Sequence, residues 1–309
     1  MSARGYFFVF TFFSFLIASA AFGQVAGHNV NMVSGTQWPT GDPFLQRQNE
    51  PSMAVSSRNP LHLFAGANDY RTVDLPGILD GEPTGDAWLG IFKSFDGGQT
   101  WISNLIPGYP QDQSQTGLAS PIKGMQAGAD ATVRQGTNGM FYYSGLGFMR
   151  GTYQSKVFVA RYIDDNNNEG GDTIRYIGTA VVDSSTGHHF IDKPSLTVDI
   201  PRAGAGTCSI PGTAATSTAP AIPVQTFAAG NIYIAYTNFV GQTGSTNTQL
   251  EFTRSTDCGA TWAGPHMLSQ TLRTNQGATL AVDSVYTTRR FYGFYGFTSP
   301  GRRQRPSHI

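Results

Sequence analysis

Three carboxylates in this chain stand where short strand-like segments begin or end, which is where loops leave a sheet. They are Glu50, Asp69 and Asp130. Two carboxylates held on either side of a glycosidic bond can cleave it, one as the acid and the other as the base or nucleophile. These three residues are therefore the candidates for catalysis.

Five more polar residues fall at similar places and are the candidates for binding a ligand: Tyr70, Arg71, Arg150, Asp192 and Lys193. An arginine guanidinium is planar and can bind a carboxylate through two hydrogen bonds. Cations and carboxylates around one pocket suit an anionic or hydroxyl-rich ligand. The alternative is that these residues are solvated rim charges or form salt bridges between structural units.

An eight-residue pattern that occurs twice predicts the elements that position these residues. Residues 94–101 and 255–262 both read Ser-x-Asp-x-Gly-x-Thr-Trp. In a tight hairpin turn the Asp and Ser side chains can bond turn amides, the Gly adopts a conformation that a Cβ penalises, and the Trp buries a large ring. The residues with these structural roles are Ser94, Asp96, Gly98, Trp101, Ser255, Asp257, Gly259 and Trp262.

The same order of strands recurs along the chain. Short first strands are expected at 51–55, 129–133, 194–198 and 278–282, and second strands at 61–68, 140–148, 231–238 and 290–297. A third strand follows in the first three units, and each octamer turns into a fourth. Four antiparallel strands repeated around an axis make a propeller blade, so we predict an all-β propeller of about three and a half blades. The alternative is a β-sandwich.

The octamer resembles the Asp-box, or BNR repeat, of sialidase-like β-propellers. The resemblance implies that the octamer is structural rather than catalytic. Sialidases of this kind use an arginine triad on the substrate carboxylate, an Asp acid/base and a Tyr nucleophile assisted by Glu. Arg71 and Arg150 are candidates for two members of the triad. The family's Tyr/Phe-Arg-Ile-Pro motif is absent, and the nearest string is Tyr70-Arg71-Thr72-Val73.

Blade geometry sorts the loops onto two faces. The octamers are third-to-fourth turns and share one face with the first-to-second loops, whereas the candidates for chemistry lie on the opposite face, where propellers of this kind bind substrate. Cys208 and Cys258 fall on the octamer face of one unit. We therefore predict a disulfide between them in an oxidising compartment, with two unrelated thiols as the alternative.

The N-terminus has the features of an export signal. Arg4 precedes an apolar run over 6–17 and a cluster of small residues, so we expect 1–23 to be a cleaved signal peptide and the mature protein to be secreted or periplasmic, without membrane contact. An uncleaved anchor is the alternative. The propeller domain is then 24–298, and 299–309 is a basic irregular tail. Because the fourth unit stops after two strands, we expect a truncated or frame-shifted propeller, or a ring closed by a strand from 27–32.

Composition narrows the classes of function. The 309 residues carry 20 Lys+Arg and 20 Asp+Glu, a balance that gives no indication of a nucleic-acid partner. Asp164, Asn166 and Asn168 have the alternation of a calcium loop, but Glu169 stands where such a loop needs Gly, so we expect a polar turn and neither metal nor cofactor. The sequence favours an exported glycosidase of exo-sialidase type acting on glycans. A non-catalytic propeller that binds glycans or proteins is the alternative.

Overall fold

The computed structural model describes residues 29–33, 48–70, 86–165, 174–241, 247–269 and 275–283, with the backbone of 291–297 and 307–308. The predicted signal peptide, Arg71, the turn at 166–171 and most of the predicted tail lie outside the described residues. Among the described elements, no helix is long and apolar enough to cross a membrane.

The described chain is built from successive antiparallel sheets, each a meander of neighbouring strands. The first blade is β1 (Asn49–Val55), β2 (Leu63–Asp69), β3 (Trp88–Ser94) and β4 (Ile102–Leu105), and the second is β5 (Ala127–Gln135), β6 (Met140–Phe148), β7 (Ser155–Asp164) and β8 (Ile174–Ser185). The third is β9 (His189–Val198), β12 (Ile232–Val240), β13 (Thr248–Ser255) and β14 (His266–Met267). The fourth is β15 (Asn275–Val282), β16 (Phe291–Phe297) and β17 (Ser307–His308).

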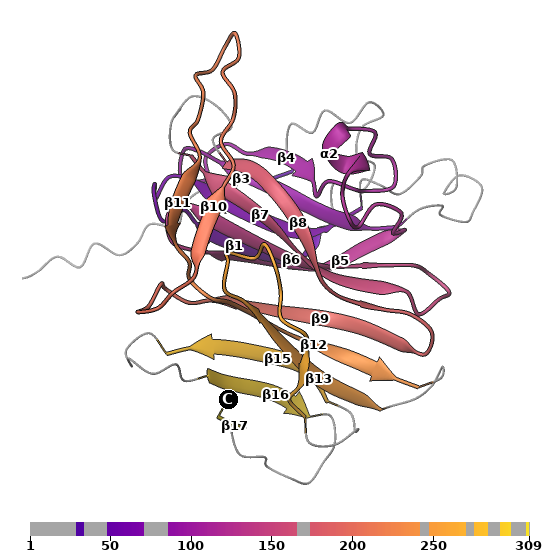
Figure 1. Cartoon of the computed structure of the whole chain (residues 1–309). Helices are drawn as coiled ribbons and strands as arrows, with labels where there is room; N and C mark the ends of the chain where they lie inside the picture. Colours follow the sequence, from indigo (N-terminus) through magenta and orange to yellow (C-terminus); the bar gives the residue numbers. More distant parts are fainter. Residues whose placement is uncertain are drawn as a thin grey trace, which may run out of the picture.

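The blades follow one another in chain order (Figure 1), and their first strands, β1, β5, β9 and β15, are neighbours in space. This arrangement confirms the predicted all-β propeller of four-stranded antiparallel blades. The one described helix, α2 (Gln115–Leu118), is a single turn in the link between the first two blades. Residues 29–33 form no strand, and Val33 packs against Ala65 and Ala67 of β2.

The structure changes the expected alignment of the second unit by two residues. Its first strand runs over Ala127–Gln135 rather than 129–133, and Thr132 takes the place that Ser52 has in β1. The two positions are equivalent because each is the first residue paired after an irregularity in its strand. The sequence did not signal this irregularity, which lengthens the strand by one unpaired residue.

Large apolar side chains fill the spaces between blades. Phe64, Tyr143 and Tyr162 pack between the first two blades, with the rings of Phe64 and Tyr162 centred 4.6 Å apart. A separate cluster that includes Tyr142 and Ile234 joins the second blade to the third. Because strands alternate, β12 sends Ile234 toward the second blade and Ala235 toward the fourth, so the third sheet is buried on both faces.

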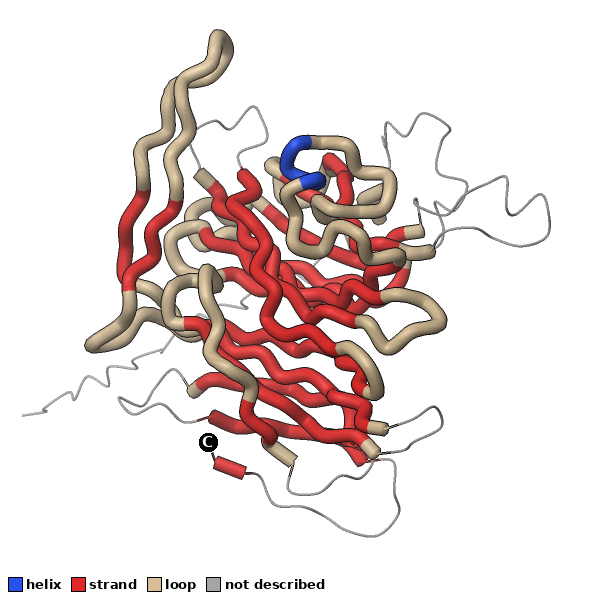
Figure 2. The backbone as a smooth tube through the Cα atoms, turned by 45° about the vertical axis from the view of Figure 1, so that its right-hand side comes forward, coloured by secondary structure: helices blue, strands red, loops and turns tan. Residues whose placement is uncertain are grey.

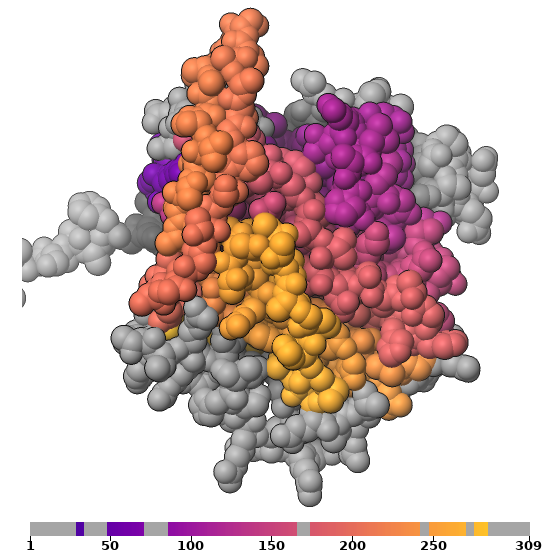
Figure 3. All heavy atoms as spheres, in the orientation of Figure 1, coloured from indigo at the N-terminus to yellow at the C-terminus, as the bar shows by residue number. Residues whose placement is uncertain are grey.

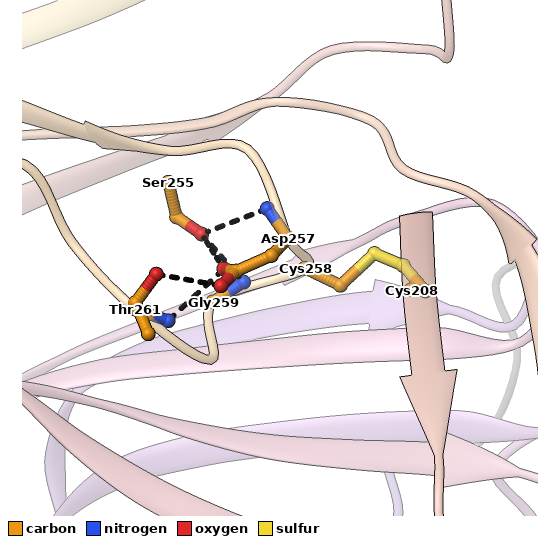
Figure 4. Close-up of a disulfide and its surroundings, with 6 residues drawn as sticks. All are labelled: Cys208, Ser255, Asp257, Cys258, Gly259 and Thr261. Carbon is orange, nitrogen blue, oxygen red and sulfur yellow. Dashed lines mark hydrogen bonds between the residues drawn. A yellow bond between two sulfur atoms is a disulfide. The ribbon is translucent and has the colours of Figure 1, made fainter. Parts of the chain in front are cut away.

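Both octamers form the same hydrogen-bonded turn. In the second one, Gly259 N donates to Ser255 Oγ at 2.8 Å, and Thr261 donates its amide and its hydroxyl to Asp257 at 2.9 and 2.6 Å (Figure 4). The bonds in the first octamer have nearly the same lengths. Hydrogen bonds from Thr100, above all from its side chain, lower the pKa of Asp96 to about 2. The octamers are therefore structural turns, as expected.

The predicted disulfide is confirmed. Cys208 and Cys258 are bonded, with their Cα atoms 5.5 Å apart, and Figure 4 shows the bridge leaving the second octamer turn. Cys208 belongs to β10 (Thr207–Ile210), which pairs with β11 (Gln225–Ala228). These strands and the chain between them form an arm, residues 207–228, that projects from the third blade (Figure 2). The disulfide ties the base of this arm to the octamer turn.

Candidate functional site at the propeller centre

The four first strands share one backbone irregularity. Each has a β-bulge at the same register, and the first residue of each bulge has positive φ: Glu50 at 52°, Asp130 at 63°, Lys193 at 51° and Gly277 at 73°. A bulge of this kind ordinarily places Gly at the left-handed position. Here only the fourth blade has Gly, and the first three have charged residues.

Backbone held in the left-handed region by a residue other than Gly or Asn costs on the order of 1 kcal/mol or more, and such strain persists where the surroundings fix it. Hydroxyl groups two residues after two of these positions provide that support. Ser52 Oγ accepts a hydrogen bond from Val133 N at 2.9 Å, and Thr132 Oγ1 lies 3.3 Å from Pro194 O, its acceptor. Each hydroxyl joins one first strand to the next, so the bulges lie at a fixed place around the axis.

The three charged bulge residues meet at the centre. Lys193 Nζ donates to Asp130 Oδ1 at 2.7 Å and to Glu50 Oε1 at 3.1 Å. Asn68 of β2 connects the same two residues, since its Oδ1 accepts from the backbone N of Asp130 at 2.9 Å and its Nδ2 donates to the Glu50 carboxylate, at Oε2, at 3.4 Å. The cluster therefore joins three blades through one ammonium group.

Burial and a second carboxylate distinguish Asp130 from Glu50. The Asp130 side chain is 9% exposed, whereas that of Glu50 is 48% exposed. Loss of solvation, with Asp192 beside it, raises the pKa of Asp130 above the usual value for an aspartate, although Lys193 opposes the shift. Although burial opposes it, the bonds to Asp130 and Glu50 raise the pKa of Lys193 to about 12. The site thus holds a buried carboxyl group with a raised pKa beside a more exposed carboxylate.

A cavity of about 250 Å³ adjoins this cluster. Its walls come from all four first strands, at and just after the bulges: Glu50, Asp130, Ala131, Thr132, Lys193, Pro194, Ser195, Gly277, Ala278 and Thr279. No described atom lies within 4 Å of where a Cβ on Gly277 would stand. The fourth blade therefore leaves space where the other three present a charged side chain.

The structure places the predicted residues in two groups. Glu50, Asp130, Asp192 and Lys193 come together at the centre. Tyr70 and Arg150 lie apart from it, and the Arg150 guanidinium bonds Asp86 and stacks over Phe148, with 67% of its side chain exposed. Asp69, the third predicted catalytic residue, is fully buried against Gly90, and it is not among the described residues that line the cavity.

Strand alternation explains the position of Asp69. Asn68 and Asp69 are consecutive on β2 and so point to opposite faces of the sheet. Asn68 faces the second blade and binds Asp130, whereas Asp69 shares the other face with Ala67. The role of Asn68 and the opening at Gly277 were not predicted. The sequence does contain a signal for the opening. Gly277-Ala278-Thr279 repeats the Ala-Thr of Asp130-Ala131-Thr132 and has Gly in place of the aspartate.

A second polar cluster, on the octamer face, is structural. Ser56 Oγ and His62 Nδ1 both bond the same oxygen of Asp164, at 2.5 and 2.9 Å, and the other ring nitrogen of His62 lies 3.0 Å from Asn59 Nδ2. A nucleophile activated by histidine needs the serine on the imidazole rather than on the carboxylate. Among the described residues, no group of three His, Cys, Asp or Glu side chains is arranged to hold a metal ion.

Comparison with known proteins finds solved structures that resemble this one, but no match of sequence. No family profile and no curated protein sequence matches the chain. The GH93 α-L-arabinofuranosidase of Fusarium graminearum, solved with arabinobiose, superposes over 85% of this chain with a TM-score of 0.46 and 12% identity. This chain spans 61% of that enzyme's length. The GH43 endo-arabinanase of Bacillus licheniformis superposes with a TM-score of 0.28 and 15% identity. The superposition covers 78% of this chain and 87% of that enzyme.

Proposed function

We propose that the protein is a glycoside hydrolase whose active site is the central cluster. The observation that carries the proposal is the meeting of Asp130 and Glu50 at one cavity, with different burial and a shared cation. One oxygen of each lies within hydrogen-bond distance of Lys193 Nζ, so the two oxygens are closer together than the sum of 2.7 and 3.1 Å. Retaining glycosidases hold their carboxyl groups about 5–5.5 Å apart, and inverting ones about 6.5–9.5 Å.

In this proposal Asp130 is the general acid. A raised pKa favours the protonated form of this carboxyl group, which gives its proton to the leaving oxygen of the glycoside. Glu50, on the more exposed side, attacks the anomeric carbon and forms a glycosyl-enzyme ester. Asp130, now ionised, then takes a proton from water, and this water cleaves the ester and regenerates Glu50. The spacing favours this retaining route because an inverting enzyme holds its carboxyl groups farther apart to admit a water molecule.

Lys193 has to turn from the carboxylates toward the ligand when a sugar enters. Among the described residues that line the cavity it is the one cation, so the exo-sialidase form of the proposal assigns it the substrate carboxylate. In a neutral glycoside it would donate to a hydroxyl group. The predicted Arg150 is not among the described residues that line this cavity, and its guanidinium is held by Asp86.

A panel of fluorogenic glycosides that includes an α-sialoside and an α-L-arabinofuranoside tests the proposal. We expect hydrolysis of at least one, and a loss of 10²–10⁴-fold in kcat for Asp130→Asn and for Glu50→Gln. Asp183→Asn is a matched control, because the amide oxygen can still accept the hydroxyl of Tyr236, which bonds Asp183 at 2.6 Å. Activity that survives in both site variants would refute these assignments.

A non-catalytic glycan-binding propeller is the second candidate, and the position of Lys193 favours it. The ammonium group bonds both carboxyl groups at once, which suits a binding site more than a pair of groups left free for acid and nucleophilic chemistry. This candidate predicts saccharide binding without turnover, and binding lost on Lys193→Gln. Lys156→Gln is its control, since Lys156 bonds only a backbone carbonyl in an exposed loop.

We also propose that the protein acts outside the cytoplasm. A disulfide such as Cys208–Cys258 persists in oxidising compartments. The sequence of 1–23 has the order of charge, apolar run and small residues that export requires. Sequencing the N-terminus of the mature protein from its native source tests this, with a start after residue 20 or 23 expected and an intact Met1 contradicting it.

A further inference from the structure

A groove of about 570 Å³ lies on the outer side of the first two blades, beneath the arm of the third. Lys93, near the octamer end of β3, and Ile174, at the start of β8, form its floor. Thr116, in α2, lines one wall, and Thr213 and Ala219 of the arm line the other. In Figure 3 the orange arm and the magenta loop that carries α2 stand on either side of the rose-coloured strand β8. The groove is more than twice the volume of the central cavity and falls in the range typical of small-ligand sites.

The arm that closes the groove is fixed by contacts at its base. Gln225 Nε2 donates to Asp165 Oδ1 at 2.8 Å, and Gln225 Oε1 accepts from Arg58 Nη2 at 2.7 Å. The Cys208–Cys258 disulfide holds the opposite strand of the arm. The arm of the third blade is therefore bound to the first and second blades, so the groove is already formed in the unliganded protein.

Charges in the groove are engaged by protein groups. Arg175 Nε donates to Asp165 Oδ2 at 2.9 Å, and Lys93 Nζ donates to Ile174 O at 2.6 Å. The whole segment 203–230, which includes the arm, has no charged residue. Because the cations are already bonded and one wall is uncharged, the groove suits a ligand without net charge.

The remaining lining combines apolar surfaces with small polar groups. Pro107, Pro220 and Ile222 present apolar surface, and the half-buried ring of Tyr176 lies beside them. Asn104, Ser114, Thr116 and Thr213 add amide and hydroxyl groups. Sugars have this same combination, since the C–H faces of a ring pack on aromatic or proline surfaces and the hydroxyl groups at its edge form hydrogen bonds.

We propose that this groove is a second binding site, separate from the central cavity, which takes a neutral oligosaccharide. The groove lies on the octamer face of the propeller, at the end of β3 and the start of β8. The central cluster lies at the opposite ends of the blades. A sugar chain bound there leaves the central cavity open. The site holds the protein on a polysaccharide and does not depend on whether the central site is catalytic.

Titration calorimetry with arabinotriose, xylotriose and cellotriose tests the proposal, and trigalacturonate serves as a charged comparison. The full-length protein with Asp130→Asn is used so that no glycoside is cleaved. We expect at least one neutral trisaccharide to bind. Ala219→Trp, which fills the groove from an exposed position on the arm, should weaken that binding at least tenfold. Ala221→Trp is the matched control, because Ala221 is exposed on the same arm and outside the groove.

Thr116→Trp fills the groove from the opposite wall and gives a second, independent variant. A thermal melt of each variant shows that it is folded, and we expect both to weaken binding. The proposal is overturned if no neutral trisaccharide binds, if folded Ala219→Trp and Thr116→Trp both bind as well as the control, or if trigalacturonate binds more tightly than every neutral sugar. Binding that is lost only on Lys193→Gln would assign all binding to the central cavity and would also overturn it.

Discussion

Reduction of the Cys208–Cys258 disulfide tests how the arm is held to the third blade. The bridge closes a loop with a sequence separation of 50 residues. In the chain-entropy account, a loop of that length constrains the unfolded chain by about 4 kcal/mol. For a chain of 309 residues, with an unfolding entropy of about 2.1 cal/mol/K per residue, that loss lowers Tm by roughly 6 °C.

Calorimetry with and without a phosphine reductant measures the shift, and intact mass under non-reducing conditions reports the state of the bridge. Cys258 has φ 59° at the place where the first octamer has Gly97 at 74°. The double variant Cys208→Ala with Cys258→Gly therefore keeps the turn and removes only the cross-link and a small buried volume. We expect its Tm to be lower and insensitive to the reductant.

Two results would refute the reasoning. One is a non-reduced peptide map that finds two free thiols. The other is a wild-type protein whose melting temperature is the same before and after complete reduction, which would show that the hydrogen bonds of Gln225 alone hold the arm.

Two further substitutions have expected effects on stability. Gly66→Ala places a Cβ against the ring of buried Tyr143, so urea unfolding should show a loss of about 1–3 kcal/mol. Gly264→Ala, with no described atom within 4 Å, should change stability by less than about 0.5 kcal/mol. Equal effects would contradict the packing between the first two blades. The pKa of Asp96 is lowered to about 2 in the folded protein, so its contribution is complete above its usual value of 3.8 and is lost as the pH falls toward 2. In Asp96→Asn the urea unfolding midpoint should therefore depend less on pH between these values. An unchanged pH dependence of the midpoint would contradict the hydrogen bonds of the octamer.

Sequence predicted the parts of the fold that depend on local chemistry. The octamer turns follow from short-range bonds of Asp96 and Asp257 to their own loops. The strand at 140–148 follows from its apolar and aromatic composition and agrees with β6. The disulfide followed from placing two loops on one face of one blade. Each of these inferences needed only neighbours in sequence or the repeat order of the strands.

The arrangement of the residues at the centre of the site depends on the backbone conformation of the bulges, which the sequence does not indicate. Glu50, Asp130 and Lys193 adopt positive φ where the adjacent first strands hold the bulges, and the side chains of Glu50 and Lys193 do not favour that conformation. The arm falls within the predicted loop between the first and second strands of the third unit, and its uncharged sequence does not signal strands. Its strands become evident only through pairing across residues 207 and 228.

The central claim is that Glu50, Asp130 and Lys193 from three blades form one ligand site at the bulges. A crystal structure of the Asp130→Asn variant soaked with the glycoside that binds best tests it most directly. We predict a sugar ring in the cavity beside Gly277, within hydrogen-bond distance of Lys193 Nζ, with its anomeric carbon facing Glu50. Sugar found only under the arm or on the rim near Arg150, with Lys193 still bonded to Glu50, would contradict the claim.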